Sequence, residues 1–322
     1  MNNIRPVSLN DFVGQPSARR ILGVLIAAAK KRGEPVPHLL LSGPPGLGKT
    51  SLARILAHEM GGRLIELIGS SVKNPHDMAH QLSQLKANDV MFVDELHAMP
   101  RKVEELLYPA MEDGIVTTNE KGFDDLVKQL GIRQGQQATK THRLPAFTLV
   151  GATTLLGLTT APLRSRFRQI IELEPYSVTD VQQIVLGVAD KLAFVLPPEL
   201  AAEIAKRSRG TARTAVSNLY WVRDVVQGDG DVATDELVRL AFDLKGVDEN
   251  GLTRTDREYL ERLVGSEEPV GAEALATALE ESIETVTGTI EPFLLREGYI
   301  NRTPRGRVAT DKARALFQGV TA

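Results

Sequence analysis

The sequence lacks cysteine in all of its 322 residues, which excludes disulfides, thiolate metal sites and a cysteine nucleophile. It also lacks any run approaching the ~20 apolar residues of a membrane-spanning helix, and its first residues show no apolar stretch like that of a secretory signal. These absences predict a cytoplasmic protein. The net charge of −3 excludes a uniformly basic nucleic-acid coat, although a local basic patch remains compatible with it.

The first half of the chain alternates short apolar strands with helical segments, which predicts an α/β fold with a parallel sheet covered on both faces. After Leu173 the pattern is helical, and it ends in two short extended pieces, which is typical of a small helical domain followed by a winged helix. We expect strands at 38–42, 89–94 and 147–152, and helices at 16–32, 51–60, 103–111, 178–192, 198–207, 211–226, 254–264, 272–279 and 283–296. The predicted domains are 1–173, 174–246 and 247–322, the last two joined by a linker near 245–251.

A phosphate-binding loop follows the first expected strand. Residues 43–50 read GPPGLGKT and fit the pattern G-x-x-x-x-G-K-[ST]. Glycines let backbone N–H groups turn inward and cradle phosphate oxygens, and those of this loop are Gly43, Gly46 and Gly48. Lys49 brings a positive charge to the terminal phosphates, and the Thr50 hydroxyl can ligate Mg²⁺. The strand before the loop and the helix after it make a chance glycine-rich turn improbable.

An acidic pair closes the second expected strand. Asp94 lies where P-loop enzymes hold the metal, and Glu95 lies where a carboxylate can orient the attacking water. A surface turn is the alternative, but the phosphate loop about 45 residues upstream argues against it. His97 is more consistent with a structural or coupling residue than with a catalytic base. The sequence therefore predicts a Mg²⁺-dependent protein that binds and hydrolyses ATP.

These motifs, in this order, resemble the RuvB family of AAA+ ATPases over nearly the whole chain, apart from some thirty residues near 114–143. The RTPRGRVAT segment behind a phosphate loop is the most specific of them. The matching segments are Ile4-Arg5-Pro6, DFVGQ at 11–15, GPPGLGKT at 43–50, DELH at 94–97, LYPAMED at 107–113, FTLVGATT at 147–154, APLRSRF at 161–167, RSRGTAR at 207–213 and RTPRGRVAT at 302–310.

The resemblance implies further roles in the nucleotide site. Thr154 corresponds to sensor 1, which contacts the γ-phosphate or the attacking water. Arg166 corresponds to the arginine finger that completes a neighbouring subunit's site, with Arg164 as the reserve for this role. Arg213 corresponds to sensor 2. Interface ion pairs are the alternative reading of Arg164 and Arg166.

The adenine and the assembly follow from the same resemblance. Arg5 and Tyr176 correspond to family positions near the adenine, although Tyr176 could be only a core residue. An arginine finger acting across subunits requires a ring or filament, and the resemblance implies a homohexameric ring.

The C-terminal hairpin is the expected DNA contact. Between residues 298 and 308 the charged residues are Arg302, Arg305 and Arg307, with no acid, and Gly306 permits a tight turn that presents two arginines together. Such a wing suits contacts to phosphates, which position duplex or four-way-junction DNA without reading its sequence. A solvated basic loop is the alternative.

The segment 114–143 departs from the family, in which it carries the hairpin that docks on RuvA. Phe123, Leu126, Val127 and Leu130 follow helical spacing, which predicts a short amphipathic helix. This helix could dock a partner other than RuvA or could fold back on its own domain. Leu155 and Ala98 also stand where arginine is usual. We therefore hypothesise a divergent motor with its own partner, encoded by a mobile element or a second gene copy.

Three functions fit these observations. The first is a RuvB-like DNA translocase and branch-migration motor. The second is a protein-remodelling or clamp-loader-like ATPase whose winged helix binds protein, and the third is a slowly hydrolysing switch. DNA-stimulated ATP hydrolysis separates the first from the others.

Overall fold

The computed structural model describes residues 4–118, 140–230 and 232–317. The chain forms two compact units: Met1–Asp180 with Thr211–Arg213, and Val181–Gly210 with Thr214–Ala322.

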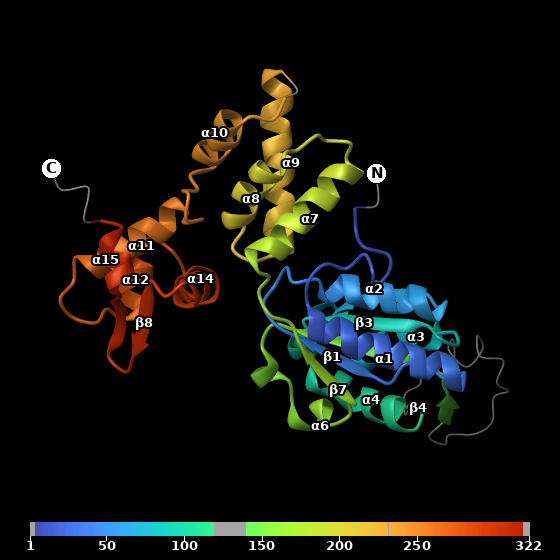
Figure 1. Cartoon of the computed structure of the whole chain (residues 1–322). Coiled ribbons are helices and arrows are strands. Elements are labelled where there is room, and N and C mark those ends of the chain that lie inside the picture. Colours follow the sequence, from blue (N-terminus) through green and yellow to red (C-terminus); the bar gives the residue numbers. More distant parts are fainter. Residues whose placement is uncertain (1–3, 119–139, 231, 318–322) are drawn as a thin grey trace. The chain divides into compact units, whose positions relative to one another are not determined.

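The first unit is built on a five-stranded parallel sheet in the order β2-β3-β6-β1-β7 (Figure 1). Its strands are β1 (Leu39–Ser42), β2 (Leu64–Ile68), β3 (Val90–Asp94), β6 (Thr148–Thr153) and β7 (Gln169–Glu172). The strands expected at 38–42, 89–94 and 147–152 are confirmed to within one residue as β1, β3 and β6. The two edge strands, β2 and β7, are largely half-buried or exposed, so hydropathy did not reveal them.

Helices cover both faces of this sheet. They are α1 (Pro16–Arg32), α2 (Lys49–Met60), α3 (Pro75–Ser83), α4 (Arg101–Glu112) and the short α6 (Ala161–Arg164). In Figure 1, α2 lies above the strands and α4 below them. The helix α1 begins with Pro16 and ends before Gly33, whose φ of 68° suits a glycine at a helix C-terminus.

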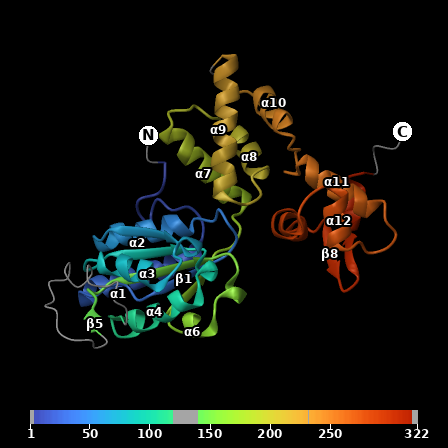
Figure 2. The ribbon, with the colours of Figure 1, turned by 180° about the vertical axis from the view of Figure 1, so that it is seen from behind.

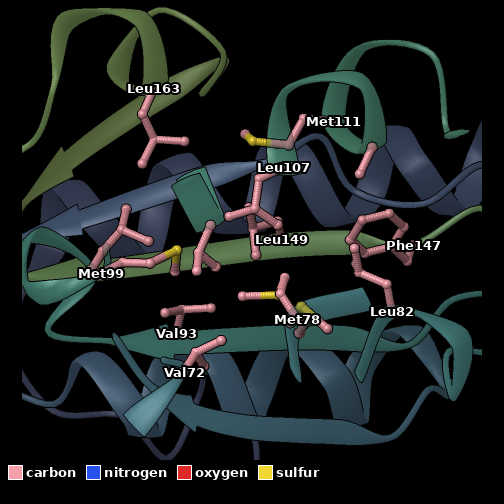
Figure 3. Close-up of a cluster of buried hydrophobic side chains, with 14 of the residues drawn as sticks. Val72, Met78, Leu82, Val93, Met99, Leu107, Met111, Phe147, Leu149 and Leu163 are labelled. Atoms are coloured by element: carbon pink, nitrogen blue, oxygen red, sulfur yellow. The ribbon is translucent and has the colours of Figure 1, made fainter. Parts of the chain in front are cut away.

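A hydrophobic core of the sheet domain lies on the face covered by α3 and α4 (Figure 3). Alternate residues of the central strands, Met91, Val93 and Leu149, point to this face and are fully buried. They pack with Met78, Leu82 and Leu107 of the two helices. This packing fixes the carboxyl ends of β3 and β6, where the predicted catalytic residues lie.

An antiparallel hairpin of β4 (Ile115–Thr118) and β5 (Lys140–Arg143) follows α4 in this domain. Figure 2 shows β5 from the opposite side. The amphipathic helix expected at 123–130 lies outside the described residues.

Helices make up the next part of the chain: α7 (Val178–Lys191), α8 (Pro198–Lys206), α9 (Ala212–Asp229) and α10 (Asp235–Lys245). The first three were predicted, although α9 continues three residues farther than expected. No helix in the described ranges is both long and apolar enough to cross a bilayer.

The last part has a core of its own, built by α11 (Arg254–Val264), α12 (Ala272–Ala278), α14 (Glu291–Arg296) and the hairpin of β8 (Ile300–Thr303) and β9 (Gly306–Ala309). The short α13 (Ile283–Thr285) and α15 (Asp311–Ala315) complete it. The expected helix at 283–296 is confirmed in outline, but a π-helical turn at Val286–Ile290 divides it. We call the β8–β9 hairpin, residues 300–309, the wing.

Candidate functional site

The loop between β1 and α2 has a backbone that requires glycine. Gly43, Gly46 and Gly48 have φ values of 139°, 81° and 99°, a region that side chains other than glycine rarely adopt. A Cβ on Gly43 would lie 2.4 Å from the Leu173 carbonyl oxygen, and one on Gly48 would lie 2.8 Å from the Phe12 ring. The loop can therefore expose its N–H groups at the start of α2, where a helix favours anions.

Lys49, the first residue of α2, is 7 % exposed. Its ammonium donates hydrogen bonds to the carbonyl oxygens of Gly43, at 2.7 Å, and Pro44, at 3.0 Å. Burial lowers the pKa of Lys49, and the nearby carboxylates of Asp94 and Glu95 oppose that shift. The lysine is thus held by neutral oxygens in the field of two acids.

Glu95 follows the end of β3 in a left-handed conformation, with φ 49°. Thr154, the residue after β6, donates a hydrogen bond from its hydroxyl to Glu95 Oε2 at 3.2 Å. The His97 Nε2 atom lies 3.4 Å from the same oxygen. Among the described residues Glu95 Oε1 has no hydrogen-bond partner, so this oxygen is available to a water molecule.

Thr153 is a residue of this site that the sequence did not reveal. It is fully buried, its hydroxyl oxygen accepts a hydrogen bond from the Leu155 N–H at 3.0 Å, and it lies 2.9 Å from His97 Nδ1. A carboxylate beside Nε2 favours the tautomer that carries its proton there, and the Thr153 hydroxyl then donates to Nδ1. Thr154 thus contacts Glu95 directly, while Thr153 contacts His97, which in turn lies beside the same carboxylate.

Asp94 and Thr50 are the residues whose side-chain oxygens were predicted to hold a metal. Asp94 ends β3, and its Oδ1 accepts the Glu95 N–H at 3.0 Å. Thr50 lies in the first turn of α2. Mg²⁺ prefers such oxygens and usually takes its other ligands from water and substrate phosphates, so this donor set fits it. The described ranges contain no group of three or more His, Cys, Asp or Glu side chains placed to hold a metal.

Tyr176 supports the phosphate loop. It is 7 % exposed, and its hydroxyl donates a hydrogen bond to the Leu47 carbonyl oxygen at 2.8 Å. Burial raises the pKa of Tyr176, so the hydroxyl remains a donor. Gln15 makes two hydrogen bonds with the backbone of Glu174, which ties the segment before α1 to the segment that carries Tyr176. Arg5 is exposed and has no hydrogen bond or ion pair with a described residue.

Arg213 lies against the phosphate loop. Its N–H donates to the Gly46 carbonyl oxygen at 3.3 Å, and its Cβ would lie 3.0 Å from a Cβ placed on Gly46. Its charge contributes to the lowered pKa of Lys49, so the two cations are close enough to interact electrostatically. The side chain itself is exposed.

The two candidate finger arginines differ in their surroundings. Arg166 stacks over the Tyr108 ring at 4.1 Å, its Nε lies 3.1 Å from a Glu112 oxygen, and its guanidinium donates to the Pro162 carbonyl oxygen. Arg164 has a half-buried side chain that forms no hydrogen bond or ion pair with any described residue. Arg166 therefore has to leave an ion pair in order to act on a second molecule.

The wing differs from the sequence-based expectation. Residues 298–308 hold no acid, but the fold brings one from outside this window: Glu291, which is fully buried and ion-paired with both Arg302 and Arg307. The charge count over this window therefore missed the acid that pairs with two of its three arginines, and of these three Arg305 is the one without an ion-pair partner among the described residues. The part of each arginine in DNA binding stays a prediction.

Comparisons with family models cover the described domains in order. The Holliday junction DNA helicase RuvB P-loop domain matches residues 4–173, the RuvB AAA lid domain matches 176–248, and the RuvB C-terminal winged helix domain matches 249–318. The parallel-sheet domain, the helical lid and the winged helix are thus the three parts of this fold.

Individual relatives match this chain over almost its whole length. The Holliday junction branch migration complex subunit RuvB of Rubrobacter xylanophilus is 45 % identical over 316 residues, which are 97 % of this chain and 86 % of that protein. The solved structure of the Thermotoga maritima RuvB Holliday junction branch migration motor is 37 % identical, covers 99 % of both chains and has a TM-score of 0.83. The Aeropyrum pernix ORC2 protein, 15 % identical with a TM-score of 0.57, shares the fold alone.

Proposed function

We propose, because the chain belongs to the RuvB family of AAA+ P-loop ATPases, that it is a motor that couples ATP hydrolysis to movement of duplex or Holliday-junction DNA. The observation that carries this proposal is one arrangement in the sheet domain. The phosphate loop, Asp94, the Thr154–Glu95 hydrogen bond and Arg213 gather at the carboxyl edge of a parallel sheet, in a chain that also has the family's winged helix. The protein-remodelling and switch alternatives are not favoured, since relatives match through all three parts.

Lys49 and the residues around it have separate roles in ATP hydrolysis. Lys49 exchanges its carbonyl partners for the terminal phosphate oxygens of ATP, an exchange that leaves no buried charge unpaired. Thr50 and Asp94 would hold Mg²⁺, which supplies positive charge to the phosphates. Glu95 orients the attacking water through Oε1, while Thr154 holds Oε2.

We propose that the adenine of ATP binds near the segment that carries Tyr176. Gln15 and Tyr176 connect the start of the sheet domain to the phosphate loop, and Arg5, the other residue predicted near the adenine, is exposed. The division into domains at 173 and 246, and the cytoplasmic location, also stay predictions.

We propose that the site is completed by Arg166 of a second copy in a homohexameric ring. The Arg166 guanidinium is tied to Glu112 and Tyr108 at the surface of its own chain, and Arg164 is the alternative donor. Mixing Arg166→Ala with Lys49→Ala chains should restore part of the turnover, because some interfaces then combine an intact loop with an intact finger. Mixed rings without any restored turnover would contradict a role across subunits.

The proposal about a protein partner concerns residues 114–143, of which the structure describes 114–118 and 140–143, including strands β4 and β5. We propose that this segment docks a partner other than RuvA. A pull-down in which a standard RuvA binds the chain as tightly as it binds RuvB would contradict this.

DNA-stimulated ATP hydrolysis tests the function. With purified chain and Mg²⁺, we expect turnover to rise when duplex or four-way-junction DNA of unrelated sequences is added, and to remain low with protein substrates. A turnover that no DNA changes, in rings that bind ATP, would favour the remodelling or switch functions. Lys49→Ala should abolish turnover with and without DNA.

A further inference from the structure

The wing is anchored by a fully buried carboxylate. Glu291, the first residue of α14, accepts hydrogen bonds at Oε1 from Arg307 Nε at 2.7 Å and from the Tyr259 hydroxyl at 3.1 Å. Its Oε2 accepts from Arg302 Nε at 2.8 Å and from Arg307 Nη2 at 3.2 Å. Both oxygens are therefore satisfied, which is the condition under which a charge can be buried at tolerable cost.

The charge state of this cluster follows from its contacts. Burial raises the pKa of Glu291, but hydrogen bonds from Arg307 and Arg302 outweigh it and hold that pKa below its usual range. Glu291 is thus ionised at neutral pH. The cluster carries one net positive charge in place of the two expected from its arginines alone.

The hairpin register explains why the acid is needed. Arg302 and Arg307 are directly opposite each other across β8 and β9. Like charges in that position repel and destabilise a strand pair, and a buried carboxylate shared by both arginines removes the repulsion. β9 is also fixed on its other side, since Val270 and Arg307 exchange two backbone hydrogen bonds at 2.9 and 2.8 Å.

Arg305 is in a different position. It lies in the turn between the strands, it is exposed, and within the described ranges its side chain has no ion-pair or hydrogen-bond partner. Arg307, by contrast, is only 18 % exposed. Moving Arg307 to a phosphate would leave Glu291 buried and less well paired, whereas moving Arg305 costs no existing contact.

We infer that Glu291 is a positioning residue of the wing, which uses Arg302 and Arg307 to fix the hairpin and leaves Arg305 as its contact to the DNA phosphate backbone. This inference rests on the proposed DNA-binding function. It assigns different roles to the three arginines of the wing, which their charge alone would treat as equivalent DNA contacts.

The substitution Glu291→Gln separates two explanations of DNA binding, because they predict opposite changes in duplex affinity. It adds one positive unit to the winged helix, so a wing that binds DNA by charge alone should bind duplex more tightly. A wing that depends on Glu291 for its shape should bind more weakly, and we expect a loss of roughly tenfold. The measurement is duplex affinity over a series of salt concentrations, on the full chain.

Three matched variants complete the experiment. Glu284→Gln makes the same charge change at an exposed residue of α13 and should not weaken binding. Glu291→Asp keeps the charge and should recover part of the affinity. Arg305→Ala should lower the slope of log affinity against log salt by roughly 1, without changing the thermal unfolding temperature.

Each outcome has a definite meaning. Binding by Glu291→Gln as tight as wild type, or tighter, overturns the inference. If Glu291→Gln does not fold, Arg307→Gln decides: equal salt slopes for Arg307→Gln and Arg305→Ala, with unchanged thermal stability in both, also overturn it. A wild-type chain that binds no duplex at any salt concentration would instead contradict the proposed function.

Discussion

The phosphate loop and the wing are both turns that bear cations, but their cations have different partners. Lys49 is held by two neutral carbonyl oxygens, while Arg302 and Arg307 share a buried carboxylate. An incoming phosphate can replace carbonyl partners without leaving a charge stranded, whereas replacing the arginines' partner would leave Glu291 unpaired in the interior. The partner of a cation, more than its presence, therefore indicates whether it is available to a ligand.

The largest effect should come from the nucleotide site. We expect Glu95→Gln to lower ATP hydrolysis about 10³-fold, because an amide cannot orient and polarise water as a carboxylate does. ATP affinity and duplex affinity should stay within a factor of about two, and rings should accumulate. Glu105→Gln, an exposed neighbour on α4, is the control. Near-normal turnover in Glu95→Gln would refute the role of Glu95.

Because the wing depends on the buried acid Glu291, removing that acid should destabilise the winged helix. Removing the charge of Glu291 leaves two opposed arginines without their counter-ion, and we expect Glu291→Gln to lower the free energy of unfolding of the winged helix by about 3 kcal/mol. Arg305→Ala should change it by less than about 0.5 kcal/mol. Denaturant titration measures both, and equal small changes would remove the distinction between the arginines.

A half-buried imidazole in the sheet domain, that of His38, provides a contrast in pH dependence. Burial lowers the pKa of His38 to about 4 from 6.5, and its Nδ1 accepts the Leu149 N–H at 2.8 Å. The neutral ring is thus favoured on folding, so its contribution is complete above pH 6.5 and is lost as pH falls toward 4. We expect about 3 kcal/mol of stability to be lost across this window.

His38→Gln should lack that part of the pH dependence when unfolding of the sheet domain is followed by denaturant titration. The contribution of Glu291, whose pKa is lowered by its arginines, is complete above the ordinary glutamate pKa and should be lost only at more acid pH. A wild-type sheet domain equally stable at pH 6.5 and pH 4.5 would contradict the contribution assigned to His38.

The smallest effect concerns the residues behind Glu95. Thr153→Val keeps the shape but removes the hydroxyl that holds His97, and we expect turnover to fall about tenfold with ATP affinity unchanged. Thr153→Ser should retain most of the turnover. If serine and valine lowered turnover equally, the hydroxyl would not be the cause. In the Glu95→Gln background Thr153→Val should have no further effect, because His97 would then hold an inactive side chain.

The phosphate loop was predictable from the sequence for a physical reason. Phosphate binding depends on backbone geometry, and the glycines that permit it, Gly43, Gly46 and Gly48, lie within one six-residue stretch and all have positive φ values. The central strands β3 and β6 were equally predictable, because buried parallel strands are continuous apolar runs. The edge strands β2 and β7 were not, since they are less buried.

The wing was predicted less completely because its decisive partner is distant in sequence. Glu291 lies eleven residues before Arg302, beyond the window in which charge was counted, and it reaches the hairpin only through the packing of α14. The role of Thr153 and the pairing of Arg166 with Glu112 were not predicted for the same reason. Contacts between side chains of separate elements follow from the tertiary fold and have no local sequence signature.

The most direct test of the central proposal is movement of a synthetic four-way junction by the purified chain with ATP and Mg²⁺. We predict ATP-dependent conversion of the junction into two duplexes by the wild-type protein, and none by Glu95→Gln, which still binds both ATP and the junction. A preparation that hydrolyses ATP, binds the junction and yet produces no ATP-dependent duplexes would contradict the assignment of this chain as a DNA motor.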